Sequence, residues 1–156
     1  MLSFLKGIGL SPGEITRLDV HHVLRWHPID GGLVALMVDA GSGSPIGAQV
    51  ITLDEFGDVR RQQYLGRRGL ICLKPHEDIE RGLALAIGLD AGLRAVRFGV
   101  PVWALPDLGS LAMFKTLSGV SITIYARPGE MSAADRLVEK WQEKGEHIEV
   151  SIVPLV

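Results

Sequence analysis

The first half of the chain alternates short apolar runs with turn residues. Leu33–Val38 and Ala48–Leu53 have the length and composition of strands. Between them, Gly41–Pro45 predicts a turn, because glycine accepts a positive φ and proline interrupts a strand. Asp54–Asp58 predicts a second turn, which leads to a strand over Arg60–Leu65. This half is therefore expected to form a small antiparallel meander.

The second half alternates apolar runs with amphipathic segments. Its predicted strands are Leu83–Ile87, Val102–Ala104, Ser121–Tyr125 and Glu149–Val153. Its predicted helices run from a cap at Asp90 to Phe98, from about Leu108 to Leu117, and from a cap at Ser132 to a stop at Gly145. Strands that alternate with helices indicate a parallel, Rossmann-like sheet with right-handed crossovers.

Together the two patterns predict an α/β protein. Residues 1–80 would form an antiparallel β-rich N-terminal part, and residues 81–156 a parallel sheet with flanking helices. The chain has 47% hydrophobic and 22% charged residues, which is ordinary for a globular protein and excludes a disordered or fibrous one. Sixteen Lys and Arg against 18 Asp and Glu give a net charge of −2, so overall charge demands no nucleic-acid or membrane partner.

Targeting and redox signals are few. Gly82–Leu89 is far shorter than the roughly 18 apolar residues of a membrane-spanning helix. Met1–Lys6 has no extended apolar stretch and does not resemble a signal peptide. Cys72 is the only cysteine, which excludes an intrachain disulfide and favours a buried, unreactive thiol. We therefore predict a cytoplasmic protein that has no membrane partner.

A group of histidines near the start of the chain is a candidate metal site. It consists of His21, His22 and His27, together with Asp19 and Asp30. The spacing fits no established zinc pattern, so ordinary surface or packed histidines are the better interpretation. No metal site is predicted here.

The segment Arg60–Arg68 holds four arginines and an aromatic residue but no acid. One interpretation is an edge strand whose charges prevent aggregation. The other is a phosphate-binding patch, with Tyr64 as a platform on which a base stacks. Alternation along a strand would place Arg60 and Arg61 on opposite faces, and likewise Arg67 and Arg68. We therefore expect two of the four arginines to bind phosphates together.

Several segments resemble one family in order and spacing. Phe4–Leu10 is similar to a "YLxxRGI" opening, and Leu24–Pro28 to an "LRFHP" motif. Leu83–Ala95, Gly99–Leu105 and Leu117–Ala126 resemble a Toprim domain. The version most similar is found in phage- and plasmid-type DNA primases and primase-helicases. The resemblance implies a β-rich part followed by a Toprim-like parallel sheet.

The catalytic positions that the resemblance implies have lost their acids. The family uses a glutamate after the first Toprim strand and a DxD pair that holds magnesium after the third. These positions fall on Ile87, Arg127 and Gly129. Magnesium needs carboxylate ligands, and the charge of Arg127 would repel it. We therefore expect no divalent metal and no cofactor, and we favour a protein that is not an enzyme.

The predicted function is that of a catalytically degenerate Toprim protein. It would be a binding or accessory module in DNA replication or in maintenance of a phage, plasmid or other mobile element. Expected partners are DNA or RNA and a replication helicase or other mobile-element protein. The residues predicted to contact nucleic acid are Arg60, Arg61, Tyr64, Arg67, Arg68 and Arg127.

Two alternatives stay open. The first is a divergent Mg-dependent phosphotransfer enzyme, primase-like or nuclease-like, that uses the remaining acids Asp90, Asp107 and Glu130. The second is a protein-binding adaptor without nucleic-acid activity. In each case Trp103 and Trp141 are expected to be core residues.

Overall fold

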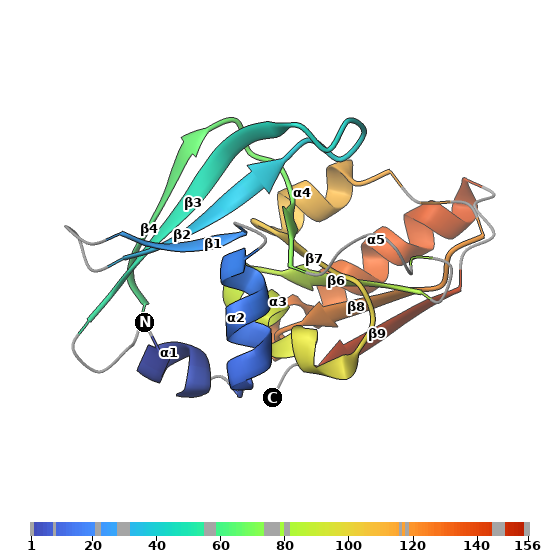
Figure 1. Ribbon diagram of the computed structural model, residues 1–156. Helices are drawn as coiled ribbons and strands as arrows, with labels where there is room; N and C mark the ends of the chain where they lie inside the picture. The colour runs from blue at the N-terminus through green and yellow to red at the C-terminus, as the bar shows by residue number, and fades with distance from the viewer. Residues whose placement is uncertain are drawn as a thin grey trace. The chain divides into compact units, whose positions relative to one another are not determined.

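The computed structural model confirms the α/β class (Figure 1). It describes residues 2–7, 9–20, 23–27, 32–54, 59–73, 79, 82–115, 117, 119–144 and 149–154. The chain forms two compact units, Met1–Cys72 and Leu73–Val156. The predicted boundary between residues 80 and 81 lies outside the described residues.

The first unit contains two short helices and an antiparallel sheet. The helices are α1 (Leu2–Gly7) and α2 (Pro12–Val20). The sheet has the order β1-β2-β3-β4, with strands β1 (Leu24–His27), β2 (Gly32–Val38), β3 (Pro45–Leu53) and β4 (Val59–Gly66). All three strand pairs are antiparallel, which confirms the meander. A two-residue strand, β5 (Ile71–Cys72), ends this unit.

Local hydrogen bonds fix the turn between β2 and β3. The Asp39 carboxylate accepts hydrogen bonds from the backbone N–H groups of Gly41 at 3.1 Å and Ser42 at 2.9 Å. The bonds from Ser42 hold the pKa of Asp39 below its ordinary value. The turn predicted from its glycines and proline is therefore present, although Pro45 is the first residue of β3. Proline is tolerated at that position of a strand.

The two faces of the antiparallel sheet differ in burial. Leu33, Ala35 and Met37 alternate along β2 and are fully buried. Ile51 of β3 pairs with Leu33 and is also buried, so these residues define the inner face. The residues between them, such as Val34, are only partly buried and form the outer face.

The second unit is built on parallel strands. The strands of this unit have the order β7-β6-β8-β9, with β6 (Leu83–Ile87), β7 (Val102–Leu105), β8 (Ile122–Ala126) and β9 (Val150–Pro154). The three pairs among β6 to β9 are parallel, and every residue of β6 is buried. The helices are α3 (Leu89–Ala95), α4 (Leu108–Met113) and α5 (Met131–Glu143), with 3₁₀ turns η2 (Val96–Phe98) and η3 (Pro128–Glu130).

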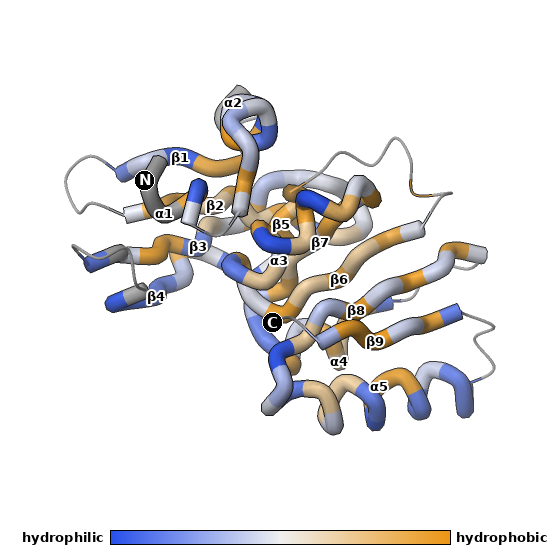
Figure 2. Tube along the Cα trace, turned by 90° about the horizontal axis from the view of Figure 1, so that it is seen from below, coloured by the Kyte–Doolittle hydropathy of each residue, from blue (hydrophilic) through white to orange (hydrophobic). Residues whose placement is uncertain are grey.

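Along β6 and β7, the two faces of this parallel sheet carry side chains of different size. Ala84, Ala86 and Ala104 lie on one face, against α3. Trp103 lies on the other face, where the ring of Phe114 is 6.1 Å from it. Phe114 is in turn 6.3 Å from the ring of Trp141 in α5. Both tryptophans are buried, at 4% and 5% exposure, which confirms them as core residues. Figure 2 shows β6 as hydrophobic along its length, whereas hydrophobic and more polar positions alternate along β8 and α5.

Three predicted helix ends are wrong. Helix α3 begins at Leu89 after an N-cap at Gly88, so Asp90 lies inside its first turn and does not cap it. Helix α4 ends at Met113, four residues before Leu117, because Phe114 adopts an extended conformation. Helix α5 begins at Met131 and contains Ser132. The predicted stop at Gly145 lies outside the described residues.

Candidate functional site

The carboxyl ends of β6 and β8 are the place where a parallel sheet of this topology binds ligands. The chain leaves β6 toward β7 on one side and leaves β8 toward β9 on the other. Such a reversal opens a crevice at the strand ends. Asp90 follows β6, and Arg127 and Glu130 follow β8, so these three residues stand at the reversal.

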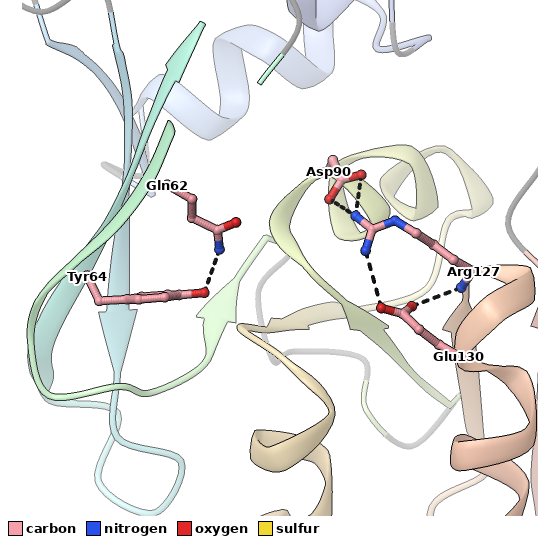
Figure 3. A network of polar contacts seen from close by, with 5 residues as sticks. All are labelled: Gln62, Tyr64, Asp90, Arg127 and Glu130. Atoms are coloured by element: carbon pink, nitrogen blue, oxygen red, sulfur yellow. Dashed lines mark hydrogen bonds and ion pairs between the residues drawn. The ribbon is translucent and has the colours of Figure 1, made fainter. Parts of the chain in front are cut away.

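At this position the side chain of Arg127 binds both Asp90 and Glu130 (Figure 3). Arg127 Nη2 lies 2.6 Å from Asp90 Oδ1 and 2.7 Å from Oδ2. Its Nη1 donates to Glu130 Oε1 at 3.3 Å, and its backbone N–H donates to Glu130 Oε2 at 3.1 Å. The hydrogen bond to Asp90 raises the pKa of Arg127 above its ordinary value. We call Asp90, Arg127 and Glu130 the strand-end cluster.

Gly88 makes room for the strand-end cluster. Its φ is 96°, in the region that favours glycine. A Cβ at Gly88 would lie 2.9 Å from Asp90 Oδ1 and 3.3 Å from Arg127 Nη2. The glycine between β6 and α3 therefore allows the carboxylate and the guanidinium to meet over the strand end.

In the strand-end cluster, the guanidinium of Arg127 is the cation that the two carboxylates bind. Asp90 and Glu130, two of the three remaining acids, both bind the guanidinium of Arg127. Within the described ranges, no group of three or more His, Cys, Asp or Glu side chains is arranged to hold a metal ion. Ile87 is buried at 2% exposure, and Gly129 is exposed in η3. The chemistry that this arrangement offers is ion pairing rather than metal coordination.

Asp107, the third remaining acid, caps helix α4. Its Oδ1 accepts hydrogen bonds from Ser110 N at 2.8 Å and Ser110 Oγ at 2.9 Å. A carboxylate at this position satisfies a backbone N–H of the first helical turn and interacts favourably with the helix dipole. The structure thus gives Asp107 a structural role at the end of β7.

Replacing Asp107 with alanine is expected to lower the free energy of unfolding by about 1 kcal/mol, because an N-cap is lost. The melting temperature should fall by about 3 °C, measured by circular dichroism. Asp107→Ser is the control, since a serine hydroxyl also caps a helix, and it should lose much less. Equal losses in both variants would contradict the capping role.

The arginines of β4 are arranged differently from the predicted alternation. Strand β4 is the edge of its sheet. Thr52 pairs with Arg61 while Leu53 pairs with Val59, so Arg60 is an extra residue in a β-bulge. The expectation that Arg60 and Arg61 lie on opposite faces is therefore wrong. Both of them line one hollow.

This hollow lies on the outer face of the antiparallel sheet and has a volume of about 770 Å³. Its lining residues come from all four strands and are His27, Val34, Val50, Thr52, Arg60, Arg61, Gln63 and Leu65. With the Gln63 amide oriented to satisfy its neighbours, its oxygen accepts from Arg61 Nε at 2.6 Å and Nη2 at 2.9 Å. We call this feature the outer hollow.

Tyr64 lies away from the outer hollow. It pairs with the buried Gln49, so its side chain is on the inner face of the sheet. Its hydroxyl accepts a hydrogen bond from Gln62 Nε2 at 2.5 Å (Figure 3), and the guanidinium of Arg68 lies 4.4 Å from the ring centre. Arg67 is exposed after the strand, and its backbone N–H donates to Ile46. The structure therefore separates the six predicted residues: Arg60 and Arg61 line the outer hollow, Tyr64 is on the inner face, Arg67 and Arg68 follow the end of β4, and Arg127 belongs to the strand-end cluster.

Sequence reasoning missed the outer hollow because its residues are far apart along the chain. The sequence nevertheless contains one indication of an apolar outer face. Leu33–Val38 is apolar at every position, whereas an antiparallel strand with one solvated face should alternate. That continuous run indicates an apolar outer face.

No protein-family model matches the chain, and no curated protein matches it either. The likeness to Toprim domains therefore stays a prediction that rests on the motifs quoted above. The geometry of the strand-end cluster and the outer hollow carries the argument about function.

The structure describes one of the three histidines that were candidates for a metal site. His27 lines the outer hollow, whereas His21, His22 and Asp30 lie outside the described residues. Cys72 is partly buried, and desolvation raises its pKa to about 11, in agreement with an unreactive thiol. No helix in the described part of the chain has the length and hydropathy needed to cross a membrane.

Proposed function

We propose that this protein is a non-catalytic nucleic-acid-binding module whose contact surface is the arginine-rich strand β4. The observation that carries the proposal is that Arg60 and Arg61 line the same outer hollow, and that none of the described residues lining it is acidic. Two guanidinium groups that line one hollow favour phosphate binding, because arginine matches phosphate oxygens in charge and geometry.

The strand-end cluster supports the non-catalytic part of the proposal. Phosphotransfer enzymes of the magnesium-dependent kind need carboxylates that are free to hold the ion. Asp90 and Glu130 instead bind Arg127, and Asp107 caps α4. The phosphotransfer alternative therefore gains no support from this arrangement.

The biological setting is part of the proposal and rests on the resemblance to phage- and plasmid-type primases. In that setting the module would act in the cytoplasm during replication or maintenance of a mobile element. Its partners would be DNA or RNA and a replication helicase or other mobile-element protein.

Salt dependence of oligonucleotide binding tests the proposal. Two arginine–phosphate contacts predict a slope of about −2 for log affinity against log salt with duplex DNA. Affinity should then fall by roughly 16-fold between 50 and 200 mM salt. Fluorescence anisotropy with labelled single-stranded and duplex oligonucleotides measures this slope directly.

Alanine variants of the β4 arginines test which residues contact the phosphates. Arg60→Ala with Arg61→Ala should abolish most of the slope, while the fold is retained because exposed arginines contribute little to stability. The matched control is Arg136→Ala with Lys140→Ala, which removes two exposed charges from α5 and should leave the slope unchanged. No binding at 50 mM salt would overturn the proposal, as would an unaltered slope when Arg60, Arg61, Arg67 and Arg68 are all replaced by alanine.

A further inference from the structure

The floor of the outer hollow is aliphatic. Val34 of β2 pairs directly with Val50 of β3, and both line the hollow. Leu65 of β4 extends this surface and is 55% exposed. The outer face of an antiparallel sheet is usually polar, because it meets water. An aliphatic floor on such a face is typical of a surface that binds an apolar partner group.

The rim of the outer hollow is polar and positively charged. Arg60 and Arg61 stand on the β4 side, and His27 is contributed by β1 at the other end of the sheet. With the Gln63 amide oriented to satisfy its neighbours, its oxygen accepts from Arg61 Nε and Nη2 and so helps to orient that guanidinium. A ligand that matches this hollow has a flat apolar part and a neighbouring anion.

We propose that the outer hollow binds single-stranded nucleic acid, with the bases against Val34 and Val50 and the phosphates against Arg60 and Arg61. This inference rests on the proposed function and specifies its ligand. The volume of about 770 Å³ lies within the range of ordinary small-ligand sites, about 300–1,000 Å³.

A duplex cannot contact both the aliphatic floor and the arginines of the outer hollow. Its bases are paired and stacked inside, so it offers the hollow only phosphates. An unpaired base exposes a flat face that covers the aliphatic floor, while its phosphate reaches the arginines. Because contact with a flat face reads no base edge, the sequence preference should be weak. Single strands should therefore bind more tightly than duplexes.

The test compares a 12-nucleotide single strand with the duplex of the same sequence, by fluorescence anisotropy at 50 mM salt. The variant is Val34→Thr with Val50→Thr, which keeps side-chain shape and branching but makes the floor polar. Its affinity for the single strand should fall about tenfold, and its salt slope should not change. Its affinity for duplex should equal that of the parent. The matched control, Val38→Thr, makes the same change on β2 outside the hollow and should have no effect.

The outcomes separate this inference from the proposed function. If Val34→Thr with Val50→Thr binds single strands as the parent does, the inference is overturned, while an arginine-dependent salt slope keeps the proposed function. Duplex binding equal to single-strand binding in the parent also overturns the inference. If the parent binds neither form at 50 mM salt, both are overturned, and a protein-binding adaptor becomes the better interpretation. Circular dichroism of each variant verifies that it folds.

Discussion

Replacing Gly92 with valine should lower the free energy of unfolding by about 3 kcal/mol, near the upper end of the cost of overpacking. A Cβ at Gly92 would lie 2.7 Å from Ala104 Cβ and 2.6 Å from Leu73 Cδ1. The leucine methyl group can rotate away, but Ala104 Cβ is attached directly to the backbone of β7. Helix α3 must therefore move off the sheet, and the melting temperature should fall by about 10 °C.

The control is a second helical glycine. Nothing lies within 4 Å of a Cβ built at Gly13 in α2, so Gly13→Ala should keep or slightly raise stability through its better helix propensity. Differential scanning calorimetry of both variants measures the effect. A Gly92→Val protein that melts with the parent would show that α3 does not pack as closely as described.

The second large effect concerns the strand-end cluster. In the parent protein, a doubly charged ion about 6 Å from the Arg127 guanidinium would be disfavoured by roughly 5 kcal/mol at an effective dielectric of about 20. That energy is about four powers of ten in the dissociation constant. Millimolar Mn²⁺ should therefore leave the parent's melting temperature unchanged.

Arg127→Ala removes this repulsion and leaves Asp90 and Glu130 without their cation. Two carboxylates at adjacent strand ends are enough for a weak divalent site. With a dissociation constant of about 1 mM, 10 mM Mn²⁺ would stabilise the variant by about 1.4 kcal/mol. The melting temperature should rise by about 4 °C.

Asp90→Asn added to Arg127→Ala is the control and should abolish the response to Mn²⁺. A response of the parent protein would contradict the view that Arg127 occupies the place of the cation. An Arg127→Ala protein that does not respond would contradict it equally. The ion pair itself is partly exposed, with side-chain exposures of 46% for Arg127 and 32% for Asp90, so its loss should cost little stability.

Regular elements were predictable because burial imposes a local pattern. The continuous apolar run Leu83–Ile87 indicated a strand covered on both faces, and β6 is buried throughout. The alternation of turns and short strands likewise predicted the antiparallel meander. In both cases the signal lies within a few adjacent residues.

Features that depend on distant partners were not predictable in the same way. The Asp90 carboxylate, predicted to cap α3, binds Arg127, which lies 37 residues further along the chain. The bulge at Arg60 arises from pairing with β3, and it brings two arginines to one face. Strand propensity and alternation contain no information on either event.

The size difference between the two faces of the parallel sheet has an evolutionary consequence. At Ala104 the strand already lies against Gly92 of α3, so a larger side chain has no space there, and the neighbouring Ala84 and Ala86 are fully buried. On the opposite face, Trp103 packs against Phe114, and a smaller residue at one of these positions can be compensated by a larger residue at the other. Substitutions should therefore accumulate around Trp103 and Phe114 and spare the small residues of β6 and β7. Distant relatives that share little overall identity would be recognised by glycine and alanine at those few positions.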